Sequence, residues 1–106
     1  MKTLIAAALL ISSTAFAQDF CDRWRSNPRY DKALNSLAAH LEYSPAEMCS
    51  LPTLLEIEVQ PFRVIDRQGE VIPHVRVYLH RSYESCYFMV RDADQVITDG
   101  RCFSTF

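Results

Sequence analysis

The side chains best suited to catalysis or metal binding are those of three histidines: His40, His74 and His80. His74 and His80 lie in a stretch of alternating polar and apolar residues, so on a β-strand they would share one face at a separation of about 20 Å. One metal ion cannot bridge that distance. Glu56 is expected opposite His80, but ordinary cross-strand pairing explains such a neighbour as well as metal binding does. The sequence therefore predicts no metal site.

Nucleophilic catalysis needs a Ser, Cys or Thr beside a base that a third group orients. The chain contains no G-x-S-x-G turn or comparable signature. Two carboxylate pairs occur, Glu56/Glu58 and Asp92/Asp94, the first on the outward face of a predicted strand and the second in a predicted turn. Neither has the apolar surroundings that raise a carboxyl pKa for acid catalysis. We expect no catalytic residue and no cofactor.

The four cysteines are Cys21, Cys49, Cys86 and Cys102. Their wide spacing matches no zinc motif, and no C-x-x-C pair suggests thiol oxidoreductase chemistry. An even number of cysteines in a small exported chain is typical of a disulfide framework. We expect all four to be structural.

Two helices are predicted to position the sheet. Asn27 or Ser26 can cap a helix that has Pro28 in its first turn. One apolar face follows at helical spacing, made of Tyr30, Ala33, Leu34, Leu37, Ala38 and Leu41. Ser44-Pro45-Ala46-Glu47 is a capping box that starts a second, short helix ending near Cys49.

From Leu54 onward the alternation is that of strands, and two hairpins are predicted: 54–65 with 70–81, and 84–91 with 95–105. The apolar phase slips by one residue after Gln60-Pro61. A β-bulge or an edge position there would explain both the slip and the proline. We expect a second bulge at Asp99-Gly100 in the last strand.

The second hairpin predicts one disulfide. If Asp92 faces Gln95 across the turn, Cys86 lies almost opposite Cys102, and a bulge at Gly100 absorbs the one-residue difference. Cys21 then pairs with Cys49. Four cysteines allow three connectivities, of which the predicted one is Cys21–Cys49 with Cys86–Cys102.

The outward face of this sheet is the candidate binding surface, because the helices can cover only one side. Its composition is that of protein interfaces, rich in Tyr, Arg, Met and His. The alternative is a solvated face of well-matched cross-strand pairs. The predicted interface residues are Arg76, Tyr78, His80, Tyr87, Met89, Arg91, Glu56 and Glu58.

The chain begins with a typical export signal. Lys2 precedes the apolar run 4–11, which is too short to span a bilayer, and Ala15-Phe16-Ala17 is a cleavage pattern. We expect residues 1–17 to be removed and residues 18–106 to form one domain in the periplasm or the medium. The net charge is −2 without a basic run, which argues against nucleic acid, and no later stretch is apolar enough for a membrane span.

The predicted fold is α+β: one or two short N-terminal helices packed on a four-stranded antiparallel β-meander, with two disulfides. This element order is similar in outline to the cystatin-like fold and to small periplasmic inhibitor and immunity proteins, such as the β-lactamase inhibitory domain and the colicin M immunity protein. The cystatin Q-x-V-x-G loop is absent, so no residue role is carried over. The leading hypothesis is an exported module that binds another protein, as an enzyme inhibitor or a toxin-neutralising protein. The alternatives are a small exported hydrolase with an unrecognised site and a structural envelope component that oligomerises through a sheet edge.

Overall fold

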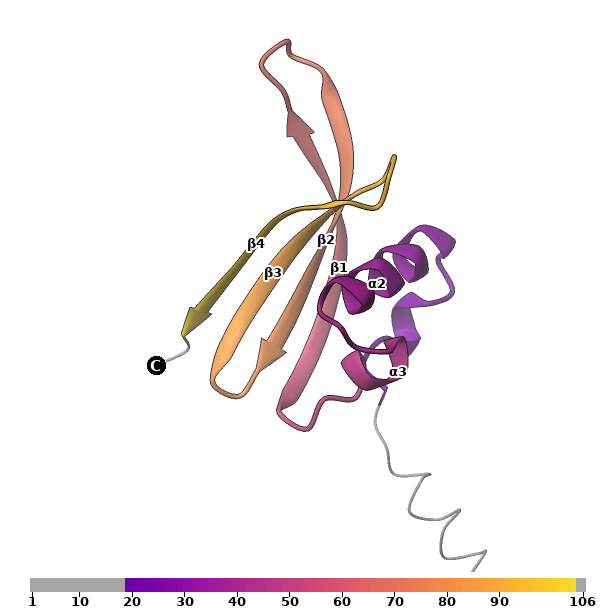
Figure 1. The fold of residues 1–106 in the computed structure, drawn as a ribbon, viewed down its shortest axis with the longest axis vertical. Coiled ribbons are helices and arrows are strands. Elements are labelled where there is room, and N and C mark those ends of the chain that lie inside the picture. Colours follow the sequence, from indigo (N-terminus) through magenta and orange to yellow (C-terminus); the bar gives the residue numbers. More distant parts are fainter. Residues whose placement is uncertain (1–18, 105–106) are drawn as a thin grey trace, which may run out of the picture.

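The computed structural model describes residues 19–104, so the predicted signal peptide (1–17) and the predicted strand residue at position 105 lie outside the described residues. The described chain is α+β, as predicted (Figure 1). Three short helical elements precede four strands, and the strands form one antiparallel sheet in the order β1-β2-β3-β4. The elements are η1 (Asp22–Trp24), α2 (Pro28–His40), α3 (Pro45–Met48), β1 (Leu54–Ile65), β2 (Val71–Arg81), β3 (Glu84–Arg91) and β4 (Ile97–Ser104).

Both predicted helix starts are confirmed. The Asn27 side chain accepts hydrogen bonds from the backbone N–H groups of Arg29, at 3.0 Å, and Tyr30, at 3.4 Å. Pro28 follows at the first helical position, where a backbone donor is not needed. Ser44 and Glu47 form the reciprocal capping box of α3. In the described part of the chain, no helix is long and apolar enough to cross a membrane.

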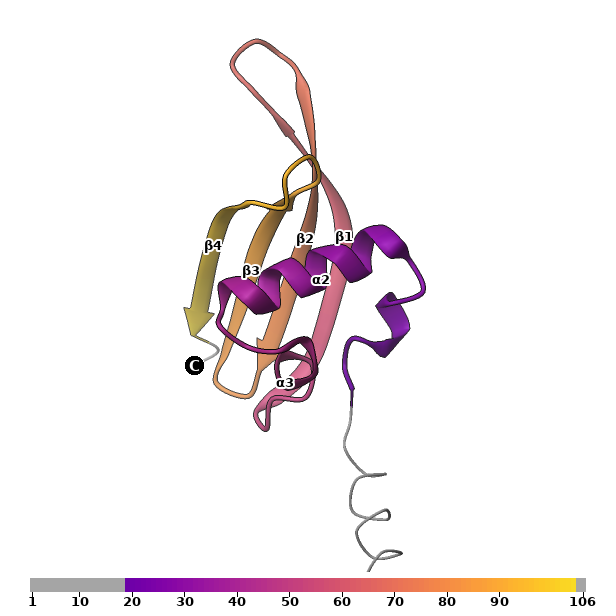
Figure 2. The same ribbon diagram turned by 45° about the vertical axis from the view of Figure 1, so that its right-hand side comes forward.

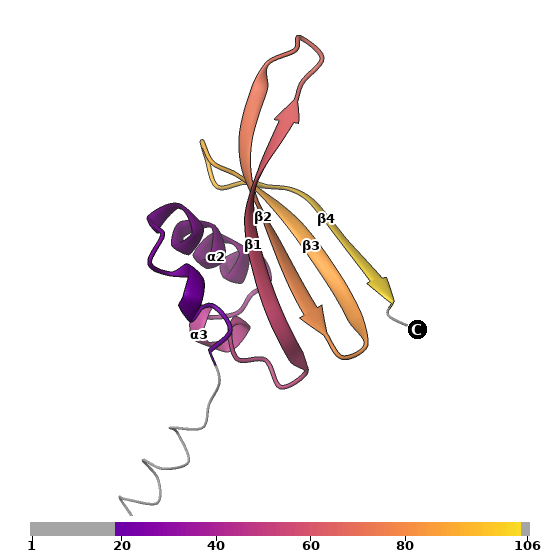
Figure 3. The same cartoon turned by 180° about the vertical axis from the view of Figure 1, so that it is seen from behind.

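Helix α2 lies across one face of the sheet (Figure 2). Its buried residues Ala33, Leu34, Leu37 and Ala38 belong to the apolar face that the helical spacing predicted, and the other two members, Tyr30 and Leu41, are partly buried against the same core. They pack against strand side chains that alternate toward the helix, which are Ile57, Val59, Val75, Val77, Leu79 and Val90. We call the opposite face of the sheet the outer face; no described helix covers it (Figure 3).

The N-terminal segment is fastened beside β1. A disulfide joins Cys21 to Cys49, as predicted, and both cysteines are buried. The Phe20 N–H donates to the Cys49 carbonyl at 2.8 Å. Trp24 donates its Nε1–H to the Ile57 carbonyl at 2.9 Å, so its ring closes part of the free edge of β1.

The phase slip in β1 is not a bulge, and that prediction is wrong. Pairing with β2 runs without a break from Glu56 to Ile65, and the irregularity in β1 lies at its start, between Leu54 and Glu56. The alternative was an edge position, which is confirmed because β1 forms one edge of the sheet. The slip arises because the residues after Val59 that point toward the helix side extend past α2 and become exposed, whereas Phe62 is half-buried on the outer face.

The second hairpin has the predicted disulfide, but its bulge does not lie at the predicted position. Cys86 and Cys102 are direct cross-strand partners and are bonded. The register shifts by one residue between Val90↔Ile97 and Met89↔Asp99, so the extra residue is Thr98 and not Asp99 or Gly100. Gly100 is needed for another reason: a Cβ there would lie 2.8 Å from Cδ1 of the Phe88 ring.

Candidate functional site on the outer sheet face

The sheet brings all eight predicted interface residues to the outer face. The cross-strand register determines this, since directly paired residues point to the same side. Tyr78 lies between Glu58 and Tyr87, and Arg76 lies beside Met89. The remaining members follow from the same alternation along the strands, with Glu56 opposite His80, and Arg91 opposite His74.

The outer face contains a hollow of about 480 Å³. Two side chains on its lining are almost completely buried although they lie on this uncovered face: His74 is 3% exposed and Met89 is 5% exposed. Met89 was predicted as an interface residue. Because it is almost completely buried, a partner could contact it only with a group that enters the hollow. The complete lining consists of Phe62, Val64, Ile72, His74, Arg76, Tyr87, Met89, Arg91, Thr98 and Asp99.

Hydrogen bonds hold the His74 side chain in place within this hollow and give it a structural role. Its Nδ1 lies 2.9 Å from the Ile72 carbonyl, which can only accept, so Nδ1 carries a proton and donates. Its Nε2 lies 3.1 Å from the Thr98 hydroxyl, which can donate to a neutral imidazole. The backbone of His74 is also held, since Arg29 donates to its carbonyl at 3.0 Å. His74 thus joins β2 to β4 across β3.

Arg76 is held in place by two rings and an amide. Its guanidinium carbon lies 4.2 Å from the centroid of Phe62 and 5.1 Å from that of Tyr78. When the Gln60 amide is oriented with its oxygen toward Arg76, it accepts from Nε at 3.1 Å and from Nη2 at 2.8 Å. The cation therefore has a fixed orientation at the rim of the hollow, a favourable condition for binding an anionic group.

An aromatic row continues from Arg76 across the sheet. The Tyr78 ring is stacked on His80 at 5.5 Å, and Tyr87 lies 6.1 Å from Tyr78. Phe103, which is 53% exposed, extends the row 6.2 Å beyond Tyr87. Sequence reasoning missed Phe103 because it followed the outward alternation only as far as β3; the same alternation continued through Asp99 and Arg101 would have included it.

Arg91 is a less available cation. It donates to both carboxylate oxygens of Asp94, from Nε at 2.9 Å and from Nη2 at 2.7 Å. This hydrogen bonding lowers the pKa of Asp94 to about 2 and raises the pKa of Arg91. In addition to its predicted role in the turn, Asp94 therefore neutralises the charge of Arg91, a predicted interface residue.

Another cluster on this face resembles a nucleophile–base–acid chain. The Ser85 hydroxyl lies 2.9 Å from Nδ1 of His80, and the Glu58 carboxylate lies 3.1 Å from Nε2 of the same ring. Glu56 lies opposite His80 in the strand pairing, as predicted, but the His80 side chain contacts the diagonal neighbour Glu58. The cluster is open to solvent, with side-chain exposures of 29% for His80 and 48% for Glu58.

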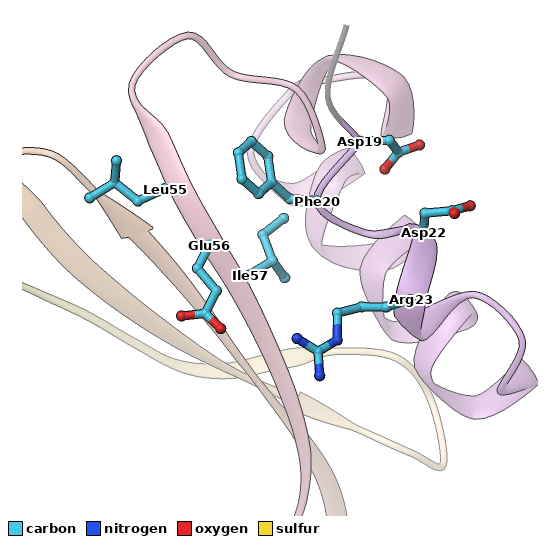
Figure 4. A pocket seen from close by; sticks show the side chains of 7 residues that line it. All are labelled: Asp19, Phe20, Asp22, Arg23, Leu55, Glu56 and Ile57. Carbon is cyan, nitrogen blue, oxygen red and sulfur yellow. The ribbon is translucent and has the colours of Figure 1, made fainter. Parts of the chain in front are cut away.

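A further hollow lies at the edge of β1 (Figure 4). Phe20 points into the space between the N-terminal segment and the strand, whereas the carboxylates of Asp19 and Asp22 point away from it. Its polar groups do not converge on one point, so we assign it no chemistry. The groups of potential metal ligands found among residues 19–104 each include a disulfide pair, whose sulfurs are not thiolates.

Comparison of the chain with protein-family models, with curated proteins and with solved structures gives no match.

Proposed function

We propose that the chain is an exported protein-binding module that acts in the periplasm or the medium and engages another protein through its outer sheet face. Its role would be that of an enzyme inhibitor or a toxin-neutralising protein. Two disulfides support the location, because such bonds form and persist in oxidising compartments. The observation that carries the proposal is the hollow on the outer face, bordered by a fixed arginine and a row of aromatic rings.

Two physical features favour binding at this face. Tyr, Trp and Arg dominate the energetics of protein interfaces, and here Tyr78, Tyr87 and Arg76 are contiguous. The rings also hold one another and Arg76 in place, so less side-chain entropy is lost when a partner binds. The structure suggests the chemistry of the contact: an apolar side chain entering the hollow over Met89, with an acidic group beside Arg76.

The test begins with capture of partners from the envelope and medium of the source organism, followed by titration of the captured protein with purified variants. The double variant R76A/Y78A should bind at least about tenfold more weakly, because two contiguous anchors are removed. Its melting temperature should stay near that of the wild type, since both side chains lie outside the main core.

A matched control is R67A/Y83A, which removes the same two residue types from turns away from the hollow. It should bind as the wild type does. Wild-type affinity in R76A/Y78A, or equal losses in both double variants, would contradict the assignment of the outer face.

A small hydrolase is the second candidate, favoured by the Ser85–His80–Glu58 chain. It would use Ser85 as nucleophile, His80 as base and Glu58 as the orienting acid. Turnover of p-nitrophenyl acetate should then disappear in S85A and in H80A and persist in H40A, which removes an exposed helical histidine. Background turnover in the wild-type protein, or unchanged turnover in S85A, would refute this role.

A further inference from the structure

The two edges of the sheet differ in how they are protected. Edge strands present unpaired N–H and C=O groups that can pair with another chain. On β1, Pro61 has no N–H, Trp24 occupies the Ile57 carbonyl, and an irregularity follows Leu54. On β4, residues 99–104 contain no proline and pair regularly with β3. The β4 edge is therefore able to accept a further strand.

The direction of the free groups on β4 follows from its pairing with β3. The Cα atoms of Cys86 and Cys102 are 4.0 Å apart, the close spacing of a non-hydrogen-bonded pair. In such a pair the backbone N–H and C=O point away from the neighbouring strand. By alternation, the same groups of Gly100 also point outward. In the single chain, the Gly100 N–H is satisfied by the Asp99 side chain at 2.9 Å.

The side chains next to these groups are complementary to their own copy. Asp99 and Arg101 lie on the outer face, opposite Met89 and Tyr87, with Gly100 between them. If two β4 strands pair antiparallel with Gly100 opposite Gly100, each Asp99 faces the Arg101 of the other chain. Within residues 19–104, Arg101 has no carboxylate within salt-bridge distance, so its charge is available for this contact.

We propose that two copies of this chain pair through their β4 edges, centred on Gly100, to form a dimer with one continuous antiparallel sheet. The Gly100 N–H groups would leave Asp99 and donate to the Gly100 carbonyl of the other copy, while Asp99 turns to Arg101 of that copy. A centre displaced to Arg101 would place two guanidiniums opposite each other, and like charges in directly opposed positions are unfavourable. The charges thus favour the register centred on Gly100, in which each Asp99 faces an Arg101, over the register centred on Arg101.

The proposed pairing has a consequence for the outer face. A two-fold axis through the Gly100 pair runs perpendicular to the sheet, so both outer faces point to the same side and both α2 helices to the other. Phe103 of each copy lies on that common side. The dimer would therefore present two hollows side by side. This inference is independent of the proposed function, because self-pairing needs no other partner.

The experiment is sedimentation equilibrium of the purified, oxidised protein over a range of concentrations, with charge variants on β4. The wild type should show a concentration-dependent shift from protomer to dimer mass. D99R places two Arg–Arg contacts in the interface and R101D places two Asp–Asp contacts, so each should weaken self-association by roughly tenfold or more. An equimolar mixture of D99R and R101D should form a heterodimer, because every opposed pair is then Arg–Asp.

Two controls match the changes in charge at exposed positions of the β1–β2 turn: E70R for D99R, and R67D for R101D. Both should associate as the wild type does. A wild-type protein that stays monomeric at about 1 mM would overturn the proposal, and so would a dimer that D99R and R101D leave intact. Failure of the mixed variants to associate would overturn the register. None of these outcomes depends on whether the outer face binds another protein.

Discussion

Removal of each disulfide should destabilise the protein to a different extent. The Cys21–Cys49 bond spans 28 residues and the Cys86–Cys102 bond spans 16. In the chain-entropy description, these loops correspond to about 3.6 and about 3.1 kcal/mol at 25 °C. Loop entropy alone therefore predicts nearly equal losses for C21A/C49A and C86A/C102A.

Burial increases the difference. Cys21 and Cys49 are 0% and 1% exposed, so replacement by alanine also removes two buried sulfurs, at roughly 1 kcal/mol each. Cys86 is buried but Cys102 is exposed, so the second variant loses only one such contribution. The expected totals are about 5.5 kcal/mol for C21A/C49A and about 4 kcal/mol for C86A/C102A.

The assay is urea unfolding of the two variants, each with its remaining disulfide verified by thiol titration. For a small domain, with a slope of about 1.5 kcal/mol per molar urea, the midpoints should differ by about 1 M. An unfolded C21A/C49A protein beside a folded C86A/C102A protein is the same result in extreme form. Equal midpoints, or a lower midpoint for C86A/C102A, would show that burial of the first disulfide is not the deciding difference.

Three further changes test particular contacts. G100A should cost about 1–2 kcal/mol because its Cβ meets the Phe88 ring, and much less in an F88A background; additive losses in the double-mutant cycle would refute this contact. W24F should cost about 1 kcal/mol, measured by urea unfolding, because it removes the hydrogen bond to β1 and keeps the ring packing. R91Q should raise the pKa of Asp94 from about 2 toward its ordinary value of 3.8, followed by carboxyl ¹³C shifts. Because that pKa is depressed in the folded state, the Asp94 contribution to stability is present above its unfolded pKa and is lost as the pH falls toward 2, and R91Q should abolish this part of the acid sensitivity.

The fold could be predicted from the sequence where local signals and long-range constraints agree. Asn27-Pro28 and the Ser44–Glu47 capping box specify helix starts through short-range hydrogen bonds. The pairing of Cys86 with Cys102 followed from counting residues back from a turn, because each residue of one strand has a fixed partner on the other. The position of the bulge at Thr98 could not be obtained in this way, since any one-residue insertion in that strand gives the same count.

The site could be predicted only as a set of residues on one face. Strand alternation is enough to place Tyr78, Tyr87 and Arg76 together. It does not show that Met89 is buried or that His80 contacts Glu58 in place of Glu56, because both depend on how long side chains lean across a twisted sheet. Those side-chain directions are decided by neighbours on other strands.

The phase slip after Gln60-Pro61 connects the fold to the candidate site. The apolar residues Ile57 and Val59 of β1 point toward α2, whereas Phe62 and Val64 point to the outer face, although the pairing with β2 is unbroken from Glu56 to Ile65. A bulge would have kept one face apolar throughout. Because the strand is unbroken but its apolar face changes, its first part must have apolar surroundings on the helix side and its second part must have them on the outer face. On the outer face, these apolar surroundings are the hollow lined by Phe62 and Met89. Gln60 and Pro61, which interrupt the alternation, therefore mark where the helix-covered core ends and the candidate binding surface begins.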